Sequence, residues 1–275
     1  MNIKNILVCL YLVSTLFLSA CGGVKLVPSS GDAAPSKRVD VSSVPNAIPK
    51  NEPKSRYGNP KSYVVFDKRY YVMESNKGFV EKGIASWYGT KFHGRRTSSG
   101  ETYDMYAMTA AHKNLPLPTY VKVTNLNNGK HIIVKVNDRG PFHENRIIDL
   151  SYTAAIKLDI IKKGTGLVEV RAIQPGDALS DSPNEGAPVK VVSSSSDNTG
   201  FYIQVGSFGQ LANAENLRIK LGPLGEHLVK ISQAVVQGQT LYRVRIGPLT
   251  DIDHSDSITT QLESYGVSEH RIVIN

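Results

Sequence analysis

The stretch GIASWYGTKFHGRRTSSGETYDM, residues 83–105, combines glycine, aromatic and charged residues without a helical period. Three shorter motifs follow it: TAAH at 109–112, LPLP at 115–118 and VNDRGPF at 136–142. A packed core does not require so many glycines and polar residues, whereas loops that carry function are often built this way. We therefore expect these motifs to form loops around a ligand, on a scaffold that the neighbouring residues supply.

Short runs of β-forming residues surround these motifs. They predict strands at 63–66, 69–73, 120–123, 131–136 and 167–173. The Asn127-Asn128-Gly129 turn predicts a hairpin between two of these strands, because Asn and Gly tolerate positive φ. Residues 152–158 predict a short helix with Ser151 as its N-cap. Many short strands with a small helix indicate a compact β-barrel.

The order and spacing of these motifs resemble the double-psi β-barrel of the rare lipoprotein A family, which is distantly similar to expansins. The resemblance covers roughly residues 63–173. Characterised members of this family are lytic transglycosylases that cleave peptide-free glycan strands of peptidoglycan. The resemblance implies cleavage between N-acetylmuramic acid and N-acetylglucosamine, which leaves a 1,6-anhydro end on the muramic acid.

This resemblance assigns catalytic roles to three residues. Glu101 corresponds to the acid that protonates the leaving glycosidic oxygen and later acts as a base; the alternative is a glutamate on a solvated turn. Asp138 is the second carboxylate, which stabilises positive charge or orients the sugar; alternatively, it caps the turn at 139–141. His112 matches the histidine of the catalytic cleft, although a lone histidine is often a structural residue.

Trp87, Tyr88 and Arg139 are the candidates for substrate binding in the barrel. The two aromatic rings are expected either to stack on sugar faces or to pack in the core. No metal or cofactor is expected, because the barrel segment has no cysteine and its histidines lack the spacing that places two ligands on one helix face. A serine or cysteine nucleophile triad has no support in the sequence either.

The last part of the chain, from residue 201, alternates between strand and helix patterns. Strands are predicted at 201–205, 228–231, 241–246 and 271–274, and helices at 212–221 and 253–265. This β-α-β-β-α-β order is the split ferredoxin-like arrangement. The motifs FYIQVGSF at 201–208 and YRVRIGPL at 242–249 resemble SPOR domains, which bind peptidoglycan lacking stem peptides at the division site.

Four polar residues of this domain are the predicted glycan-binding residues: Gln204, Ser207, Arg243 and Arg245. The two-residue period of a strand places both arginines on one face of the sheet. The same fold binds RNA elsewhere through aromatic residues on its sheet. The export signal and the lack of a block of consecutive basic residues make nucleic acid an implausible partner.

The first 20 residues are expected to be a signal peptide. Their apolar run, at 6–20, is shorter than the roughly 20 residues that a membrane-spanning helix needs. The motif LSAC at 18–21 resembles the lipobox of bacterial lipoproteins, which implies that acyl chains on Cys21 anchor the protein to a membrane. Gly22 in place of Asp favours the outer membrane. The alternative is an ordinary secretory signal with an incidental cysteine.

The chain of 275 residues, with a net charge of +8, has room for two modest domains and is attracted to polyanions. We expect a signal peptide at 1–20, a disordered tether at 21–60, the barrel at 61–174, a linker at 175–199 and the SPOR domain at 200–275. The predicted protein is a monomeric outer-membrane lipoprotein that faces the periplasm and cleaves peptidoglycan at the division septum. A non-catalytic, expansin-like glycan-binding protein and an envelope scaffold are the alternatives.

Overall fold

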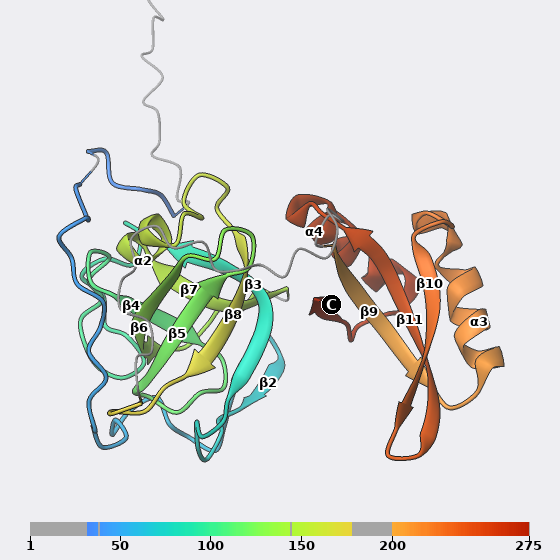
Figure 1. Ribbon diagram of the computed structural model, residues 1–275, viewed down its shortest axis with the longest axis horizontal. Helices are drawn as coiled ribbons and strands as arrows, with labels where there is room; N and C mark the ends of the chain where they lie inside the picture. The colour runs from blue at the N-terminus through green and yellow to red at the C-terminus, as the bar shows by residue number, and fades with distance from the viewer. Residues whose placement is uncertain (1–31, 38, 144, 178–199, 275) are drawn as a thin grey trace, which may run out of the picture. The chain divides into compact units, whose positions relative to one another are not determined.

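The computed structural model describes residues 32–37, 39–143, 145–177 and 200–274. The predicted signal peptide, Cys21 and most of the predicted linker lie outside the described residues. No helix in the described ranges is long and apolar enough to cross a membrane. These ranges form two folded parts, a β-barrel and a C-terminal α+β domain (Figure 1).

Six strands close into the barrel, and their order around it, β3-β7-β4-β6-β5-β8, differs from their order in the sequence. The first half of β3 runs antiparallel to β8, and its second half runs parallel to β7. Parallel pairing also joins β4 to β6. The strands are β3 (Val80–Tyr88), β4 (Thr109–His112), β5 (Thr119–Asn125), β6 (His131–Asp138), β7 (Arg146–Ser151) and β8 (Gly166–Ala172). The predicted double-psi β-barrel is confirmed.

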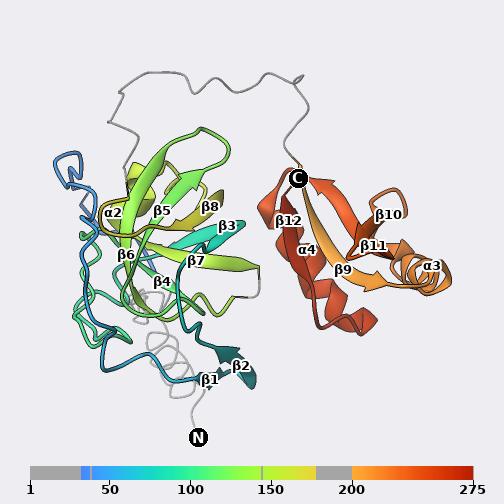
Figure 2. The same cartoon turned by 60° about the horizontal axis from the view of Figure 1, so that its bottom comes forward.

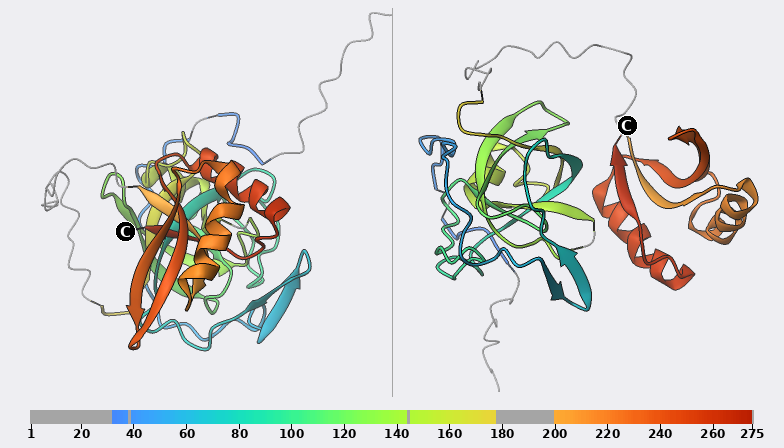
Figure 3. Two further views of the ribbon diagram at one scale, coloured as in Figure 1. Left: turned by 90° about the vertical axis from the view of Figure 1, so that its right-hand side faces the viewer. Right: turned by 90° about the horizontal axis from the view of Figure 1, so that it is seen from below.

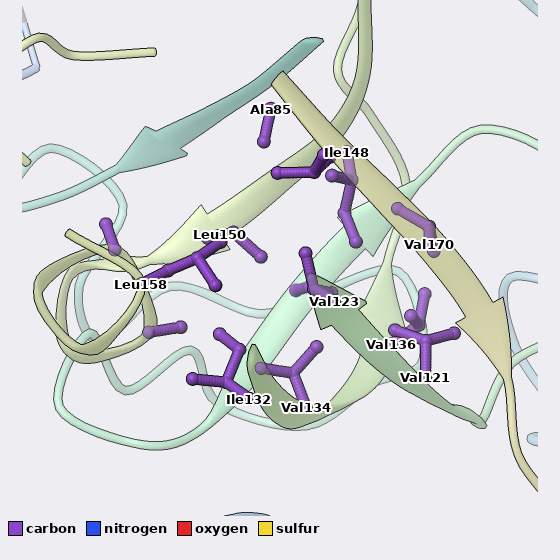
Figure 4. Packing of buried hydrophobic residues seen from close by; sticks show 14 of the residues in the cluster. Ala85, Val121, Val123, Ile132, Val134, Val136, Ile148, Leu150, Leu158 and Val170 are labelled. Carbon is purple, nitrogen blue, oxygen red and sulfur yellow. The ribbon is translucent and has the colours of Figure 1, made fainter. Parts of the chain in front are cut away.

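Aliphatic side chains fill the barrel interior and come from all six strands (Figure 4). In β6, the side chains of Ile132, Val134 and Val136 are at most 2% exposed. Each such side chain stabilises the fold by about 1.5–3 kcal/mol through burial. Because side chains alternate along a strand, this packing turns Lys135 and Asn137 to the other face. That face carries the candidate site.

Two local predictions in the barrel are confirmed. The Ser151 hydroxyl accepts a hydrogen bond of 3.2 Å from the Ala154 N–H and caps helix α2 (Tyr152–Lys157). The turn between β5 and β6 contains Gly129 at φ +73°, a backbone conformation that favours glycine. Both features follow from side-chain chemistry within a few residues, which explains why the sequence predicted them.

The segment that precedes the barrel, residues 39–60, differs from the disordered tether predicted for it. It runs along the outside of the barrel (Figures 1 and 3). Val41 is buried, the Ala47 N–H donates to the Ile133 carbonyl at 3.0 Å, and the Ser55 N–H donates to the Leu117 carbonyl at 2.8 Å. Composition predicted disorder because the segment has few large apolar residues of its own. The barrel wall provides the partners that the segment lacks.

A hairpin follows this segment, as predicted from the sequence. Strand β1 (Ser62–Val65) pairs antiparallel with β2 (Lys68–Tyr71), and Phe66 and Asp67 make the turn with positive φ (Figure 2). The Tyr63 and Tyr70 rings stack with 5.4 Å between their centroids. The Tyr63 hydroxyl donates to the Lys113 carbonyl at 2.7 Å, which fixes the hairpin to the barrel.

The C-terminal domain is a four-stranded antiparallel sheet in the order β10-β11-β9-β12 with two helices. Buried residues of both helices, including Ala214 and Ile258, join those of the sheet in one core. The elements are β9 (Phe201–Phe208), α3 (Leu211–Lys220), η2 (Gly222–Leu224), β10 (Val229–Val236), β11 (Gln239–Leu249), α4 (Ile252–Leu262), η3 (Glu263–Tyr265) and β12 (Arg271–Ile274). The predicted ferredoxin-like order of elements is confirmed.

The β10–β11 hairpin is longer than the sequence predicted. Its two-residue turn consists of Gln237 at φ +49° and Gly238 at φ +78°, which suits the right-handed twist of the flanking strands. The prediction ended the first strand at 231, whereas β10 continues to Val236. The outer half of the hairpin is largely exposed, so hydrophobic pattern gives little signal there.

Candidate active site

Glu101 lies in a tight loop between β3 and β4. The Thr97 N–H donates to the Glu101 carbonyl at 2.8 Å, and the Gly100 N–H donates to the Thr97 carbonyl at 2.9 Å. Gly100 has φ +94°, a backbone conformation that is energetically costly for a residue with a side chain. The loop thus fixes the backbone of Glu101, while its carboxylate is 45% exposed to solvent.

Two residues of β6 hold this carboxylate. Lys135 Nζ donates to Glu101 Oε1 at 2.8 Å, and Asn137 Nδ2 donates to Oε2 at 2.7 Å. Both donors lie on the face of β6 that points away from the aliphatic core of the barrel. The predicted acid is therefore held in place at both oxygens and remains accessible to a ligand.

Asp138, the last residue of β6, ties the strand to the same loop. Its Oδ1 accepts hydrogen bonds from the Ser98 N–H at 2.7 Å, from the Ser98 hydroxyl at 2.6 Å and from the Arg139 N–H at 2.7 Å. The last bond is the turn cap that the sequence left open as an alternative. The structure thus brings both predicted carboxylates, Glu101 and Asp138, to one end of β6 and the 97–101 loop.

Lys135 has a second carboxylate partner. Its Nζ lies 3.0 Å from Glu52 Oε2, and the Tyr120 hydroxyl donates to the other oxygen of Glu52. Burial alone would lower the pKa of Lys135, but the hydrogen bonds to Glu101 and Glu52 outweigh it and raise that pKa. The bond from Tyr120 lowers the pKa of Glu52 despite partial burial. Lys135 is thus a cation shared by two carboxylates.

Sequence reasoning missed Lys135, Asn137 and Glu52. The alternation of Lys135 and Asn137 with Val134 and Val136 was a usable signal, because it places two donors beside the motif that contains Asp138. Glu52 had no such signal, since it lies in the segment that was predicted to be disordered.

Within the described residues, His112 forms no hydrogen bond with the carboxylate of Glu101 or Asp138. Its ring is 2% exposed, and Nδ1 accepts from the N–H groups of Asn114 at 3.1 Å and Leu115 at 3.0 Å. Nε2 lies 3.4 Å from a carboxylate oxygen of Glu81. Burial lowers the pKa of His112 and keeps the ring neutral. These contacts support the structural alternative, in which His112 holds the turn after β4.

Arg139 was predicted to bind substrate, but its guanidinium donates to the protein itself. Nε and Nη2 donate to the Gly58 carbonyl at 2.9 and 2.7 Å. Nη1 donates to the carbonyls of His112 at 3.1 Å and Leu115 at 2.6 Å. Burial lowers the pKa of this guanidinium. Its planar donors therefore join residues 58 and 112–115 to the end of β6, and these contacts favour a structural role for Arg139 over the predicted substrate binding.

The two aromatic candidates lie in or against the core. Tyr88 is 7% exposed and stacks on Tyr103 with 4.1 Å between ring centroids, which favours the alternative in which it packs in the core. Trp87 is partly buried and meets Tyr152 edge-on at 5.9 Å. The packing alternative describes both residues.

Comparisons with known proteins cover both domains. Residues 80–170 match the family model described as lytic transglycolase, and residues 197–268 match the SPOR domain model. A protein of Vibrio cholerae named endolytic peptidoglycan transglycosylase RlpA is 42% identical over 260 residues, which cover 94% of this chain and 93% of that protein. This chain belongs to the RlpA family.

Two further relatives carry the RlpA name. The endolytic peptidoglycan transglycosylase RlpA of Pseudomonas aeruginosa strain UCBPP-PA14 is 41% identical, over 81% of this chain and 78% of that protein. The crystal structure of the RlpA SPOR domain from Pseudomonas aeruginosa is 32% identical and covers 28% of this chain and 100% of that one, with a TM-score of 0.26.

The SPOR sheet of this RlpA family member brings its four predicted glycan-binding residues together. Ser207 lies opposite Arg243 and Gln204 lies opposite Arg245, whose Nε donates to Gln204 Oε1 at 3.4 Å. Sequence reasoning missed Arg271, which lies opposite Gln204 on the other side. Burial and the charges of Arg243 and Arg271 lower the pKa of Arg245. Three like charges on neighbouring strands favour an anionic or polyhydroxylated ligand.

The barrel site has the groups that acid–base cleavage of a glycosidic bond requires. Glu101 is accessible and fixed at both oxygens by β6 residues, and Asp138, the last residue of β6, is fixed through one oxygen. Within the described residues, no group of three or more His, Cys, Asp or Glu side chains could hold a metal ion.

Proposed function

We propose that this protein is an endolytic lytic transglycosylase of peptidoglycan that acts on peptide-free strands. The observation that carries the proposal is the pair of anchored carboxylates, Glu101 and Asp138, at one end of β6. Membership of the RlpA family supports it, because the relatives named above are called endolytic peptidoglycan transglycosylases.

In the first step, protonated Glu101 gives its proton to the oxygen that joins C1 of N-acetylmuramic acid to N-acetylglucosamine. The C1–O bond breaks, and Asp138 stabilises the positive charge that develops at C1 and the ring oxygen. Lys135 and Asn137 keep the Glu101 carboxyl group in position before and after this transfer.

In the second step, the C6 hydroxyl of the same muramic acid attacks C1. Ionised Glu101 takes the hydroxyl proton and is restored to its starting state. One bond forms for each bond broken and no water is consumed, so the products are a 1,6-anhydro end and an N-acetylglucosamine with a free 4-hydroxyl. A nucleophilic side chain is not needed.

The SPOR domain would bring this site to denuded glycan at the septum. Its arginines supply positive charge, and binding of one strand by two linked domains raises the local concentration of substrate at the barrel. We further propose that acyl chains on Cys21 anchor a monomer to the outer membrane, facing the periplasm. His112 remains a predicted residue of the site. Its proposed role is to position the turn at 112–115 through its hydrogen bonds with Asn114 and Leu115.

Product analysis tests the proposal. The purified protein and its Glu101→Gln variant are incubated with peptide-free glycan strands, and the soluble fragments are identified by mass spectrometry. Fragments with 1,6-anhydro ends from the wild type alone are expected. If strands bind but no fragment forms, the protein is instead a non-catalytic, expansin-like glycan-binding lipoprotein.

A further inference from the structure

An exposed tyrosine lies beside the catalytic loop and has no role in the mechanism above. Tyr57 belongs to the segment at 39–60 and is 53% exposed. Its N–H donates to the Ser55 hydroxyl at 3.3 Å, and that hydroxyl donates to the Ser99 carbonyl at 2.7 Å. The Ser55 N–H is in turn bound to Leu117. Tyr57 therefore has a backbone fixed to the loop that carries Glu101.

The geometry around Gly100 shows how close this tyrosine is to the acid. A Cβ atom on Gly100, the residue before Glu101, would lie 3.2 Å from Cδ2 of Tyr57 and 3.2 Å from Nη2 of Arg96. The aromatic ring and the guanidinium thus both approach the backbone that positions the Glu101 carboxylate. Both groups therefore lie next to the residue that precedes Glu101.

Two guanidinium groups lie near the Tyr57 ring. Cζ of Arg96 is 5.6 Å from the ring centroid and Cζ of Arg56 is 5.8 Å from it. Both arginines are exposed, and neither forms an ion pair with another residue that the structure describes. The electron-rich ring holds the cations in place without neutralising them. Their donors stay available for an anion.

We propose that Tyr57, Arg56 and Arg96 form a binding subsite for an N-acetylmuramic acid residue that bears a free lactyl carboxylate. The apolar side of the sugar ring lies against the tyrosine, and the carboxylate accepts charge-assisted hydrogen bonds from the guanidinium groups. This inference rests on the proposed function and gives it a source of selectivity. A stem peptide converts the lactyl carboxylate into an amide, which removes the charge that the subsite binds.

Two strand preparations test the subsite with the full-length chain. One has free lactyl carboxylates, and the other is the same material after chemical conversion of those groups into amides. The wild type should cleave the free-carboxylate strands with a kcat/KM about tenfold higher than the amidated strands, since each lost charge-assisted bond weakens binding. The Arg56→Gln, Arg96→Gln double variant should lose this preference, because its kcat/KM on the free-carboxylate strands falls toward its value on the amidated strands.

Aromatic variants separate stacking from charge. Tyr57→Ala should raise KM for both preparations, whereas Tyr57→Phe should behave like the wild type. Tyr71→Ala is the matched control, because Tyr71 is 65% exposed on β2 and should tolerate truncation without a change in either constant. The subsite would be overturned if the double variant lost kcat/KM equally on both preparations. It would also be overturned if Tyr57→Ala had the same KM as Tyr71→Ala.

Failure of the proposed function gives a different result. In that case the wild type releases no fragment from either preparation, and the subsite is judged by binding alone. All variants share the same SPOR domain, so a difference in dissociation constant between wild type and the double variant on free-carboxylate strands reports on the barrel. A weaker dissociation constant for the double variant would support the subsite, and equal constants would overturn it.

Discussion

The Glu101–Asp138 pair and the His112–Arg139 pair come from the same run of sequence motifs but have opposite surroundings. The carboxylates of the first pair are held by neighbouring residues at the edge of the barrel, where a ligand can reach them. The ring and guanidinium of the second pair are largely buried and form most of their hydrogen bonds with backbone groups. The same run of motifs thus supplies both an accessible carboxylate and buried groups that join loops to the barrel.

Glu101→Gln should produce the largest effect on activity. The substitution keeps the hydrogen-bonding shape but removes the proton that cleavage requires, so the rate should fall by roughly 10²–10⁴-fold. The free energy of unfolding should change little, because the side chain is half exposed. Fragment release and thermal unfolding measured on one preparation check both points. A rate within a few-fold of the wild type would remove Glu101 from the reaction.

Arg139→Ala should show the reverse pattern, with stability as its main effect. It leaves the carbonyls of Gly58, His112 and Leu115 without their donor, and the free energy of unfolding should fall by about 3 kcal/mol. Urea unfolding measures the loss. Arg139→Lys is the matched variant, and it should recover only part of the stability because a lysine cannot reproduce the planar fork. An unchanged unfolding midpoint for Arg139→Ala would contradict the structural role.

Lys135→Met tests the cation that joins the first pair to the 39–60 segment. Removing it leaves Glu101 and Glu52 without their shared partner, and the rate should fall by about tenfold as Glu101 loses one of its two anchors. Glu52→Gln is the control, because it keeps the bond between Lys135 and Glu101. Steady-state kinetics compare the two variants. Equal losses of activity in Lys135→Met and Glu52→Gln would contradict the positioning role of Lys135.

The smallest expected effect is a pH dependence of stability from His112. Burial lowers the pKa of this residue from its ordinary 6.5, so the unfolded chain binds a proton where the folded chain does not. Stability therefore falls as the pH drops below about 6.5. Between about pH 7 and about pH 5.5, the wild type should lose about 1 kcal/mol more than His112→Asn.

The comparison with His112→Asn is needed because a second buried group titrates in the same range with the opposite sign. Burial raises the pKa of Asp149 to about 6, so its contribution to stability improves as the pH falls. Asp149 is the same in both proteins, and its effect cancels in the difference of the two unfolding free energies. Parallel pH profiles would contradict the burial of a neutral His112.

The sequence predicted the parts of the fold that depend on local chemistry and on long apolar patterns. The cap at Ser151, the turn at Gly129 and the order of elements in the C-terminal domain belong to this group. The resemblance to a known family singled out Glu101 and Asp138. These residues could be found because their motif spacing is visible along the chain.

What the sequence did not predict depends on contacts between distant residues. Arg139 contacts Gly58 and Lys135 contacts Glu52, each across about eighty residues of chain. The composition of a segment with few apolar residues predicts disorder, because composition contains no information about the surface on which the segment packs. The same limit concealed Tyr57, whose importance comes only from its position beside Gly100.

We propose that the Glu101 site closes the muramic acid ring on itself instead of adding water. Cleavage of peptide-free strands in water enriched in a heavy oxygen isotope tests it most directly, with the new ends read by mass spectrometry. We predict 1,6-anhydro ends that carry no heavy oxygen, and no such ends from Glu101→Gln. Reducing ends that carry one heavy oxygen would show that water attacks C1, and the account of this site would be wrong.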